Sequence, residues 1–461
     1  MVRALAASGA LAVLAGVLLA EPARAADYFV PGDFPTIQAA LLAAADGDTI
    51  HVAAGTWTGP LDTRDLDIEL RGEGAGVSVI DALGAPVVLS AGLGDDVSIV
   101  HVIGFTITGG GDGVVTIAGG KVDLTQCEVR DNPGTGGRGH IDAHSCSFTG
   151  NGSHGLESFD ALWDCTFEGN GGWGAQKLDA KFEGPPMQYC RFLGNGLGGA
   201  RLVVSSPGPA WPPEIKLLNV TFVGDNLQVS ALGEVGSTVL RQVTLLGGTV
   251  KLLQGALTVT DSILRSPTPI TDLSPTGDVS VSWSDLPGTW LPGTGNIDAD
   301  PLFTDEAGGD YTLLPGSPCI NAGDPAVIAD PDDSPADMGA FTFDPWTLLG
   351  LGPPGGPMLA GGGALIAGKP IGLKLFAVPQ EVLWVVISTT ELHVPFKGGV
   401  LWPAPDLVFP AVPLPFAFQI ALGNWPAGLP AGQTFVTQVW WPEASAASGW
   451  ISTNGLRGTQ P

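Results

Sequence analysis

Basic residues are scarce in this chain of 461 residues. Lys and Arg number 19 against 46 Asp and Glu, so the formal net charge is −27 at pH 7. A surface this acidic repels phosphate backbones, which argues against nucleic acid as a partner. Acidic polysaccharides would be repelled as well, unless a local basic patch or bound cations intervene.

Long apolar runs are also scarce, and the one that stands out lies at the N-terminus. It covers Ala4–Ala20, follows Arg3 and precedes the small-residue sequence Ala23-Arg24-Ala25. This order is typical of a secretory signal peptide over residues 1–25, with a retained membrane anchor as the alternative. No later stretch reaches about 18 uninterrupted apolar residues, so we expect no membrane span after cleavage. The mature chain is expected to be secreted or held at the cell surface.

Only five cysteines occur, and four of them occupy one position of a repeated phrase. Successive cysteines of the phrase lie 19, 19 and 25 residues apart, and the Asn that ends each copy repeats these intervals. A period near 20 with strand-like residues predicts stacked coils rather than one globular core. The copies are Gln126–Asn132, Ser145–Asn151, Asp164–Asn170 and Tyr189–Asn195.

Alternation along each strand predicts which side chains are buried. The Cys and the residue two places later should face the core, and the residue between them should face water. The Asn should adopt the left-handed backbone of a sharp turn and bond to the Asn of the next coil. Buried free thiols are expected, with disulfides as the alternative, and Cys319 has no evident mate. The water-facing set is Thr106, Glu128, Ser147, Thr166, Arg191, Thr221 and Ile263; the stacked sets are Cys127, Cys146, Cys165 and Cys190, and Asn132, Asn151, Asn170 and Asn195.

Two flanking stretches complete a resemblance to a known family. Phe34–Leu41 followed by Gly47–Val52 looks like an opening cap and first coil, and Asp300–Phe303 with Asp337–Ala340 looks like a closing coil. The chain thus resembles the right-handed parallel β-helix, or pectin-lyase-like, proteins. The resemblance implies a solenoid of about 13 coils over residues 26–345, capped by a helix near Pro35–Ala45. It implies no activity, because the fold carries lyases, hydrolases, epimerases and proteins without known catalysis.

The composition changes after the solenoid. Residues 346–370 are rich in Gly, Pro and Ala and read as a linker. Residues 371–461 hold short apolar runs separated by Pro and Gly, which predicts a small β-sandwich. Ser452–Leu456 resembles a C-terminal β module of bacterial secreted proteins, a likeness that implies no chemistry.

Catalytic sets of the resembled family are not recognisable. Its lyases use clustered Asp residues for calcium and an Arg or Lys as base, and its galacturonases use adjacent Asp residues with Gly-His-Gly. The adjacent pairs Asp95-Asp96 and Asp332-Asp333 lie in turn-like sequence, and His140 and His144 share a strand face with Asp142 without forming a zinc set. No cofactor is expected, with a structural calcium ion as the alternative. Its weak candidate ligands are Asp298, Asp300 and Asp305.

A side surface is the better candidate for function. Asn151, Asn170 and Asn195 are each followed four residues later by a Gly that begins another strand, and Gly139 takes that place in a longer loop after Asn132. Arg138, His154 and Trp173 stand just before these glycines, and Glu157, Gln176 and Arg201 should point outward beyond them. An aromatic residue at the edge of such a polar column could lie against a sugar chain. The alternative is an ordinary solvated face with a Trp that covers a turn. The candidate residues are Arg138, His154, Glu157, Trp173, Gln176 and Arg201.

Three functions remain open from the sequence. The leading hypothesis is a non-catalytic protein that binds polysaccharide, or another extracellular partner, along the side of the helix. The alternatives are a polysaccharide lyase or glycoside hydrolase, and a structural or adhesive spacer. A Lys or Arg that faces a carboxylate cluster in a groove would favour the enzyme, and an evenly polar side would favour the spacer.

Overall fold

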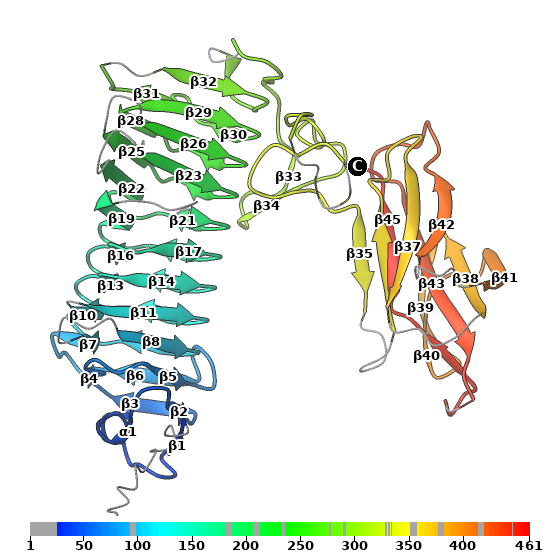
Figure 1. Ribbon diagram of the computed structural model, residues 1–461. Coiled ribbons are helices and arrows are strands. Elements are labelled where there is room, and N and C mark those ends of the chain that lie inside the picture. The colour runs from blue at the N-terminus through cyan, green and yellow to red at the C-terminus, as the bar shows by residue number, and fades with distance from the viewer. Residues whose placement is uncertain are drawn as a thin grey trace, which may run out of the picture.

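A stack of parallel coils forms the larger part of the molecule (Figure 1). The computed structural model describes residues 25–461 except 93–97, 118, 181–186, 206–212, 233–235, 276–277, 289–291, 328–329, 331, 333, 351–356, 377–381, 414–418 and 445. The expected signal peptide, Asp95-Asp96 and Asp333 therefore lie outside the described residues, apart from Ala25. Three parallel sheets, here called A, B and C, run along the stack, and the chain visits them in that order in each coil.

From β2 (Thr49–Val52) to β32 (Val279–Ser282), every third strand along the chain belongs to the same sheet. Sheet A holds β1 (Asp27–Val30), β2 (Thr49–Val52), β5 (Ile68–Arg71), β8 (Ser98–Ile103), β11 (Gly120–Thr125), β14 (Ile141–His144), β17 (Ala161–Trp163), β20 (Met187–Gln188), β23 (Glu214–Leu218), β26 (Ser237–Arg241), β29 (Ala256–Thr260) and β32 (Val279–Ser282). Sheet B holds β3 (Gly55–Thr58), β6 (Ser78–Asp81), β9 (Thr106–Thr108), β12 (Glu128–Arg130), β15 (Ser147–Thr149), β18 (Thr166–Glu168), β21 (Arg191–Leu193), β24 (Thr221–Val223), β27 (Thr244–Leu246) and β30 (Ile263–Arg265). Sheet C holds β4 (Leu61–Asp62), β7 (Val87–Ala91), β10 (Asp112–Thr116), β13 (Gly137–Arg138), β16 (Leu156–Glu157), β19 (Trp173–Ala180), β22 (Gly198–Ser205), β25 (Leu227–Leu232), β28 (Val250–Gln254) and β31 (Ile270–Asp272).

The expected parallel β-helix is therefore confirmed, with a shorter stack than predicted. The described sheets hold 12, 10 and 10 strands rather than 13 coils. The difference arises after β32, where the described part of residues 283–343 adds no strand to the three sheets and continues sheet B only by single parallel bridges, from Ile263 to Asp285 and from Asp285 to Ile297. This closing segment carries the hairpin β33 (Phe303–Asp305) and β34 (Asp310–Leu313) and folds back against the coils.

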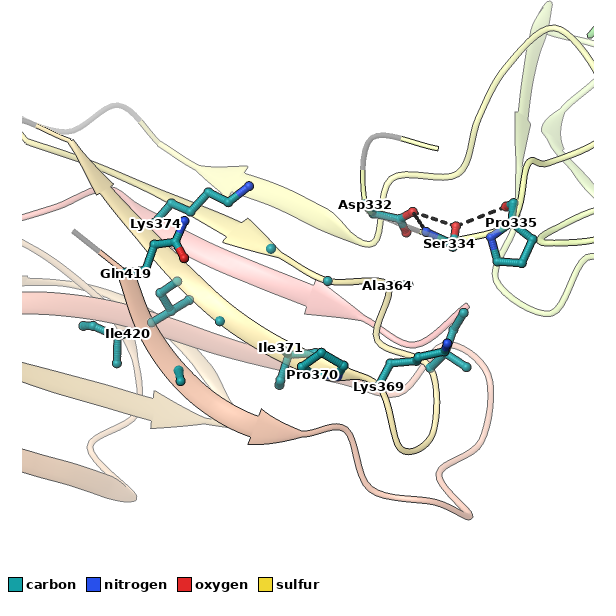
Figure 2. A pocket seen from close by; sticks show the side chains of 16 residues that line it. Asp332, Ser334, Pro335, Ala364, Lys369, Pro370, Ile371, Lys374, Gln419 and Ile420 are labelled. Carbon is teal, nitrogen blue, oxygen red and sulfur yellow. Dashed lines mark hydrogen bonds between the residues drawn. The ribbon is translucent and has the colours of Figure 1, made fainter. Parts of the chain in front are cut away.

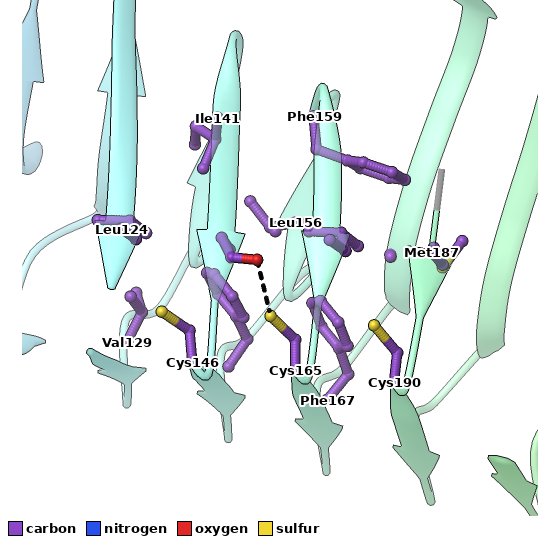
Figure 3. Close-up of a cluster of buried hydrophobic side chains, with 14 of the residues drawn as sticks. Leu124, Val129, Ile141, Cys146, Leu156, Phe159, Cys165, Phe167, Met187 and Cys190 are labelled. Carbon is purple, nitrogen blue, oxygen red and sulfur yellow. Dashed lines mark hydrogen bonds between the residues drawn. The ribbon is translucent and has the colours of Figure 1, made fainter. Parts of the chain in front are cut away.

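The expected core columns are buried, as Figure 3 shows for one part of the stack. Four Phe rings stack along sheet B with centroids 5.0, 4.9 and 4.9 Å apart and planes within 10° of parallel. All five cysteines are free and buried, as predicted. Burial raises the pKa of the Cys319 thiol to about 12, so it stays protonated. The stacked rings are those of Phe148, Phe167, Phe192 and Phe222.

An asparagine ladder joins the turns between sheets B and C. Asn132 Nδ2 donates to Asn151 Oδ1 at 3.1 Å, and the next two steps, to Asn170 and Asn195, measure 3.0 and 2.9 Å. Asp225 ends the ladder by accepting from Asn195 at 2.7 Å.

The left-handed residue of these turns is not the Asn, contrary to the prediction. It precedes the Asn and is Asp131 in the first copy and Gly150 in the next, with φ of 54° and 62°. Glycine has no Cβ to oppose this backbone, which leaves the Asn side chain free to turn inward toward the ladder.

A second left-handed column lies where each coil bends from sheet A to sheet B. It occupies the position just before each Cys, with φ between 51° and 56° from Gln126 to Gln242. One residue in this conformation makes the whole bend, so its side chain projects from the corner of the coil. The column is Gln126, Ser145, Asp164, Tyr189, Asn219 and Gln242.

The water-facing column of sheet B is only partly exposed, which corrects the prediction. Thr221 and Ile263 are buried. Ile263 packs with Leu313, Cys319 and Met338 of the closing segment, which thus covers this part of the sheet. Thr106 is also buried, and its hydroxyl accepts a hydrogen bond from the Gly76 amide.

Helix α1 (Ile37–Ala43) packs against β1, β2 and β4 at the N-terminal end of the stack, as expected. Its apolar face of Ile37, Ala40 and Leu41 is buried, and Thr36 Oγ1 caps it by accepting from the Ala39 amide at 3.2 Å. The helix covers apolar side chains that the first coil would otherwise expose.

The C-terminal region forms the predicted β-sandwich, and the expected linker belongs partly to it. β35 pairs with β45, and β36 pairs with β37, so residues 346–370 contribute two strands to the sheets. The short apolar runs in residues 346–370 form paired strands despite the surrounding Gly and Pro. One sheet holds β35 (Trp346–Leu349), β38 (Val382–Ser388), β41 (Leu407–Pro413), β43 (Thr434–Pro442), β44 (Trp450–Ser452) and β45 (Gly455–Thr459); the others hold β36 (Met358–Gly362), β37 (Pro370–Phe376) and β42 (Gln419–Asn424), and β39 (Glu391–Phe396) and β40 (Gly399–Pro403).

A charge in the Phe stack should unfold several coils. Phe167→Asp places an unpaired carboxylate between two rings, at a cost of several kcal/mol. The neighbouring outward residue gives a matched control, because Thr166→Asp adds the same charge on the outer face of sheet B. Circular dichroism should show a strongly lowered melting temperature for the first variant alone. Equal melting temperatures would contradict the assignment of faces.

The closing segment should lose stability as the pH rises. Asp285 is fully buried and its Oδ2 has no hydrogen-bond partner among the described residues. Burial raises its pKa from 3.8 to about 6 despite Arg265 at 3.3 Å. A raised carboxyl pKa means that folding takes up a proton, so this stability is present below about pH 4 and is lost through about pH 6. We expect the unfolding free energy to fall by about 1–3 kcal/mol over this pH range. Asp285→Asn should reduce this pH dependence, and the remainder comes from Asp330 and Asp337, whose pKa values burial raises to about 6 and about 7. An unchanged profile would contradict the account.

Candidate functional site

Three of the candidate residues on sheet C, Glu157, Gln176 and Arg201, lie in one column as predicted, but Gln176 is buried rather than exposed to water. Arg138 pairs in register with Glu157, Glu157 with Gln176, and Gln176 with Arg201. Arg138 is already engaged by Asp112, with its guanidinium nitrogen 2.7 Å from the carboxylate. Arg138, predicted at the edge of the column, lies within it, because its strand begins at Gly137 rather than at Gly139.

Trp173 does not form an exposed platform beside this column. Its side chain is buried, with a relative exposure of 8%. The ring lies against Gly198 on the next coil, where a Cβ would come within 2.6 Å of it. The Trp173 amide donates to His154 Nδ1 at 2.9 Å, and burial lowers the pKa of that His, which keeps the accepting nitrogen free of a proton. The expectation of a largely exposed ring is wrong, and Trp173 covers a turn.

Exposed aromatic side chains gather instead at the corner between sheets A and B. Trp163 and Tyr189 are 43% and 48% exposed, and their rings lie 4.9 Å apart at 55°. Trp163 pairs in register with His144 on one side and Gln188 on the other. The pair Trp163 and Tyr189 is called the aromatic corner below.

The repeat held a signal for the aromatic corner. Trp163 stands two residues before a repeat Cys and Tyr189 one residue before the next, and the same alternation places Trp163 outward. The predicted surface comprised only residues that follow each Asn, which lie on sheet C, and therefore did not include this corner.

An ionic cluster lies on sheet A beside the aromatic corner. Lys121 Nζ is 2.6 Å from Asp142 and 3.8 Å from Asp123, and His101 Nδ1 is 3.2 Å from Asp123. Burial lowers the pKa of Lys121, but the hydrogen bond and charge of Asp142 outweigh it, and the pKa is raised. Burial raises the pKa of Asp123, which the nearby Lys121 offsets only in part. His144 shares this outer face with Asp142, as predicted.

A cavity of about 460 Å³ continues from Tyr189 along the stack. One wall comes from the coils, through Tyr189, Asn219 and Gln242 of the left-handed column together with Leu218 and Arg241 of sheet A. The other wall comes from the closing segment. It consists of Thr312, Asp330, Ala340, Phe341 and Thr342.

A larger cavity of about 780 Å³ lies between the closing segment and the sandwich (Figure 2). Its described lining includes glycines of β36 and β37, with Lys369 and Lys374 on one side and Asp332 on the other. Asp332 accepts from the Ser334 amide at 3.0 Å, as a turn carboxylate does. No aromatic side chain is among these described lining residues, so the cavity offers little to a sugar ring.

The calcium candidates do not assemble into a site. Asp298 binds Arg265 at 2.9 Å, Asp300 accepts from the Leu302 amide, and Asp305 accepts from the Gly308 amide. In the described part of the chain, no group of three or more His, Cys, Asp or Glu side chains is placed to hold a metal ion. The residues present therefore do not fit the clustered-Asp calcium sites of the resembled lyases. Helices long and apolar enough to cross a bilayer are likewise absent from the described residues.

Comparison with known proteins gives distant structural likenesses only. No family model and no curated protein sequence matches the chain. The pectate lyase Pel9A is similar with a TM-score of 0.39 and 15% identity over 69% of this chain and 96% of that one. A GH87 α-1,3-glucanase from Streptomyces thermodiastaticus is similar with a TM-score of 0.38 and 15% identity over 60% of this chain and 66% of that one. The tailspike gp49 of Acinetobacter baumannii bacteriophage Fri1, a capsular polysaccharide depolymerase, is similar with a TM-score of 0.35 and 10% identity. The match covers 92% of this chain and 80% of that one. These likenesses carry no argument about function, and the strand pairing itself makes the chain a parallel β-helix with a C-terminal β-sandwich.

Proposed function

We propose that this is a secreted β-helix protein that binds a polysaccharide along the corner between sheets A and B. The observation that carries the proposal is the aromatic corner, because two large rings stay about half exposed where the fold could have placed polar residues. Exposed aromatic pairs with polar neighbours are the kind of surface on which sugar rings stack. The signal-like N-terminal sequence supports secretion.

The surroundings of the aromatic corner suit a chain of sugars better than a single one. Polar groups continue along sheet A from His144 to Gln188, and the cavity beside Tyr189 adds amide and hydroxyl groups. Parallel strands lie about 4.8 Å apart, so these groups recur at a short, regular spacing along the stack. An extended polymer could therefore contact several coils at once. An evenly polar spacer would have no need of the exposed rings.

Glycoside hydrolysis is the second candidate, favoured by the ionic cluster. Lys121 faces two carboxylates, which is the arrangement expected of an enzyme rather than a spacer. The raised pKa of Lys121 keeps its proton in place, which suits a charge partner and not the base of a lyase. The raised pKa of Asp123 suits a proton donor, and Asp142 on the adjacent strand supplies a second carboxyl group.

If the protein hydrolyses glycosidic bonds, it should release new reducing ends from a polysaccharide without unsaturated products. Asp123→Asn and Asp142→Asn should each abolish that release while leaving polysaccharide binding in place. Release of unsaturated products would indicate a lyase instead. Binding without any product, at high enzyme concentration and long incubation, would reject catalysis and leave the binding function.

Trp163→Ala should weaken polysaccharide binding by about 1–2 kcal/mol, by analogy with the loss of a base-stacking ring. The melting temperature should change little, because the ring is half exposed. Phe29→Ala is a matched control, since Phe29 is an exposed ring on the same sheet at the far end of the stack. Calorimetry on a bound glycan should show the loss for Trp163 alone.

Trp173→Ala should give the reverse pattern, with a lower melting temperature and unchanged binding. Its ring is buried on sheet C, away from the aromatic corner. Weaker binding by this variant, at an unchanged melting temperature, would return the site to sheet C.

A further inference from the structure

We infer that the cavity beside Tyr189 is a subsite for an uncharged sugar unit and discriminates against uronic acids. This inference rests on the proposed polysaccharide binding and adds the class of glycan. The cavity is continuous with the aromatic corner, because Tyr189 belongs to both.

Neutral hydrogen-bonding side chains stand on both walls of the cavity. Asn219 and Gln242 follow Tyr189 in the left-handed column, whose side chains project from the corner of each coil. Thr312 and Thr342 line the opposite wall. Amides and hydroxyls both donate and accept, which matches sugar hydroxyl groups that do the same.

The charged groups disfavour an incoming carboxylate. Of the described lining residues, Arg241 alone is positively charged, and its Nε lies 3.2 Å from Oδ2 of the fully buried Asp261. Asp330 lines the same cavity, and Asp164 precedes Tyr189 in the left-handed column. A uronate would thus meet one guanidinium that is already paired with Asp261 and one lining carboxylate, that of Asp330, among the described residues. In a partly enclosed site such repulsion is screened less than on an open surface.

The same charges favour an uncharged sugar. A hydroxyl group can donate to the Asp330 carboxylate, and hydrogen bonds to ionised acceptors are among the stronger ones. Arg241 has nitrogens besides the Nε that faces Asp261, and these can donate to a sugar oxygen. Neither contact requires the ligand to bring a charge into the cavity.

The test compares uncharged and acidic oligosaccharides on the full protein. The probes are cello-, xylo-, laminari- and malto-oligosaccharides, set against oligogalacturonate and alginate oligomers. At pH 7.5, above the pKa of about 6 to which burial raises Asp330, the wild type should bind an uncharged probe and bind the acidic probes more weakly. Asp330→Asn keeps an oxygen to accept from the Asp337 amide, so its fold should persist. It should strengthen binding of acidic probes by roughly three- to tenfold and leave uncharged probes nearly unchanged.

Glu157→Gln is the matched control, because it removes the same charge from the outer face of sheet C. It should leave both classes of probe unchanged, which separates a local effect from a change in net charge. Preferential binding of uronates by the wild type, or no gain in Asp330→Asn, would overturn the inference. If Trp163→Ala still weakened binding in that case, the proposed function would stand. Absence of binding to every probe would reject both.

Discussion

The stacking of equivalent groups from coil to coil is the constraint on which the rest of the structure depends. In the asparagine ladder, each buried amide donates to the next Asn, and the backbone amide of one Asn also donates to the following side chain, as Asn132 does to Asn151 at 3.2 Å. A buried amide without such partners costs free energy, so each rung fixes the position of the next. The parallel Phe rings repeat the same register in the core.

This register turns single residues into surfaces. Because the coils from Gln126 to Gln242 each bend at one left-handed residue, the side chains at that position line up along the corner, whatever their chemistry. Near the middle of the stack the line includes Tyr189, Asn219 and Gln242, and it borders the cavity. The closing segment supplies the opposite wall, so the groove exists only where that segment folds back on the coils. The regular coils and the closing segment that folds back on them together form the candidate site.

The sequence predicted whatever depends on periodicity alone. Cys165 and Phe167 recur with the coil, and their burial followed from alternation, as did the outward direction of Glu157. The burial of Trp173 could not be read in this way, because it depends on the missing side chain of Gly198 on the next coil.

Contacts between segments far apart in the sequence could not be predicted from periodicity either. The burial of Ile263 depends on Met338 of the closing segment, which has no periodic relation to the coils. In the same way, residues 346–370 looked like a linker until β35 and β36 were seen to pair within the sandwich sheets.

The central claim is that the glycan-binding face is the corner between sheets A and B. A crystal structure with a bound uncharged oligosaccharide tests it most directly. The account predicts sugar rings over Trp163 and Tyr189, with one unit reaching the cavity near Arg241. A ligand lying along Glu157, Gln176 and Arg201 on sheet C, with the aromatic corner left empty, would contradict it.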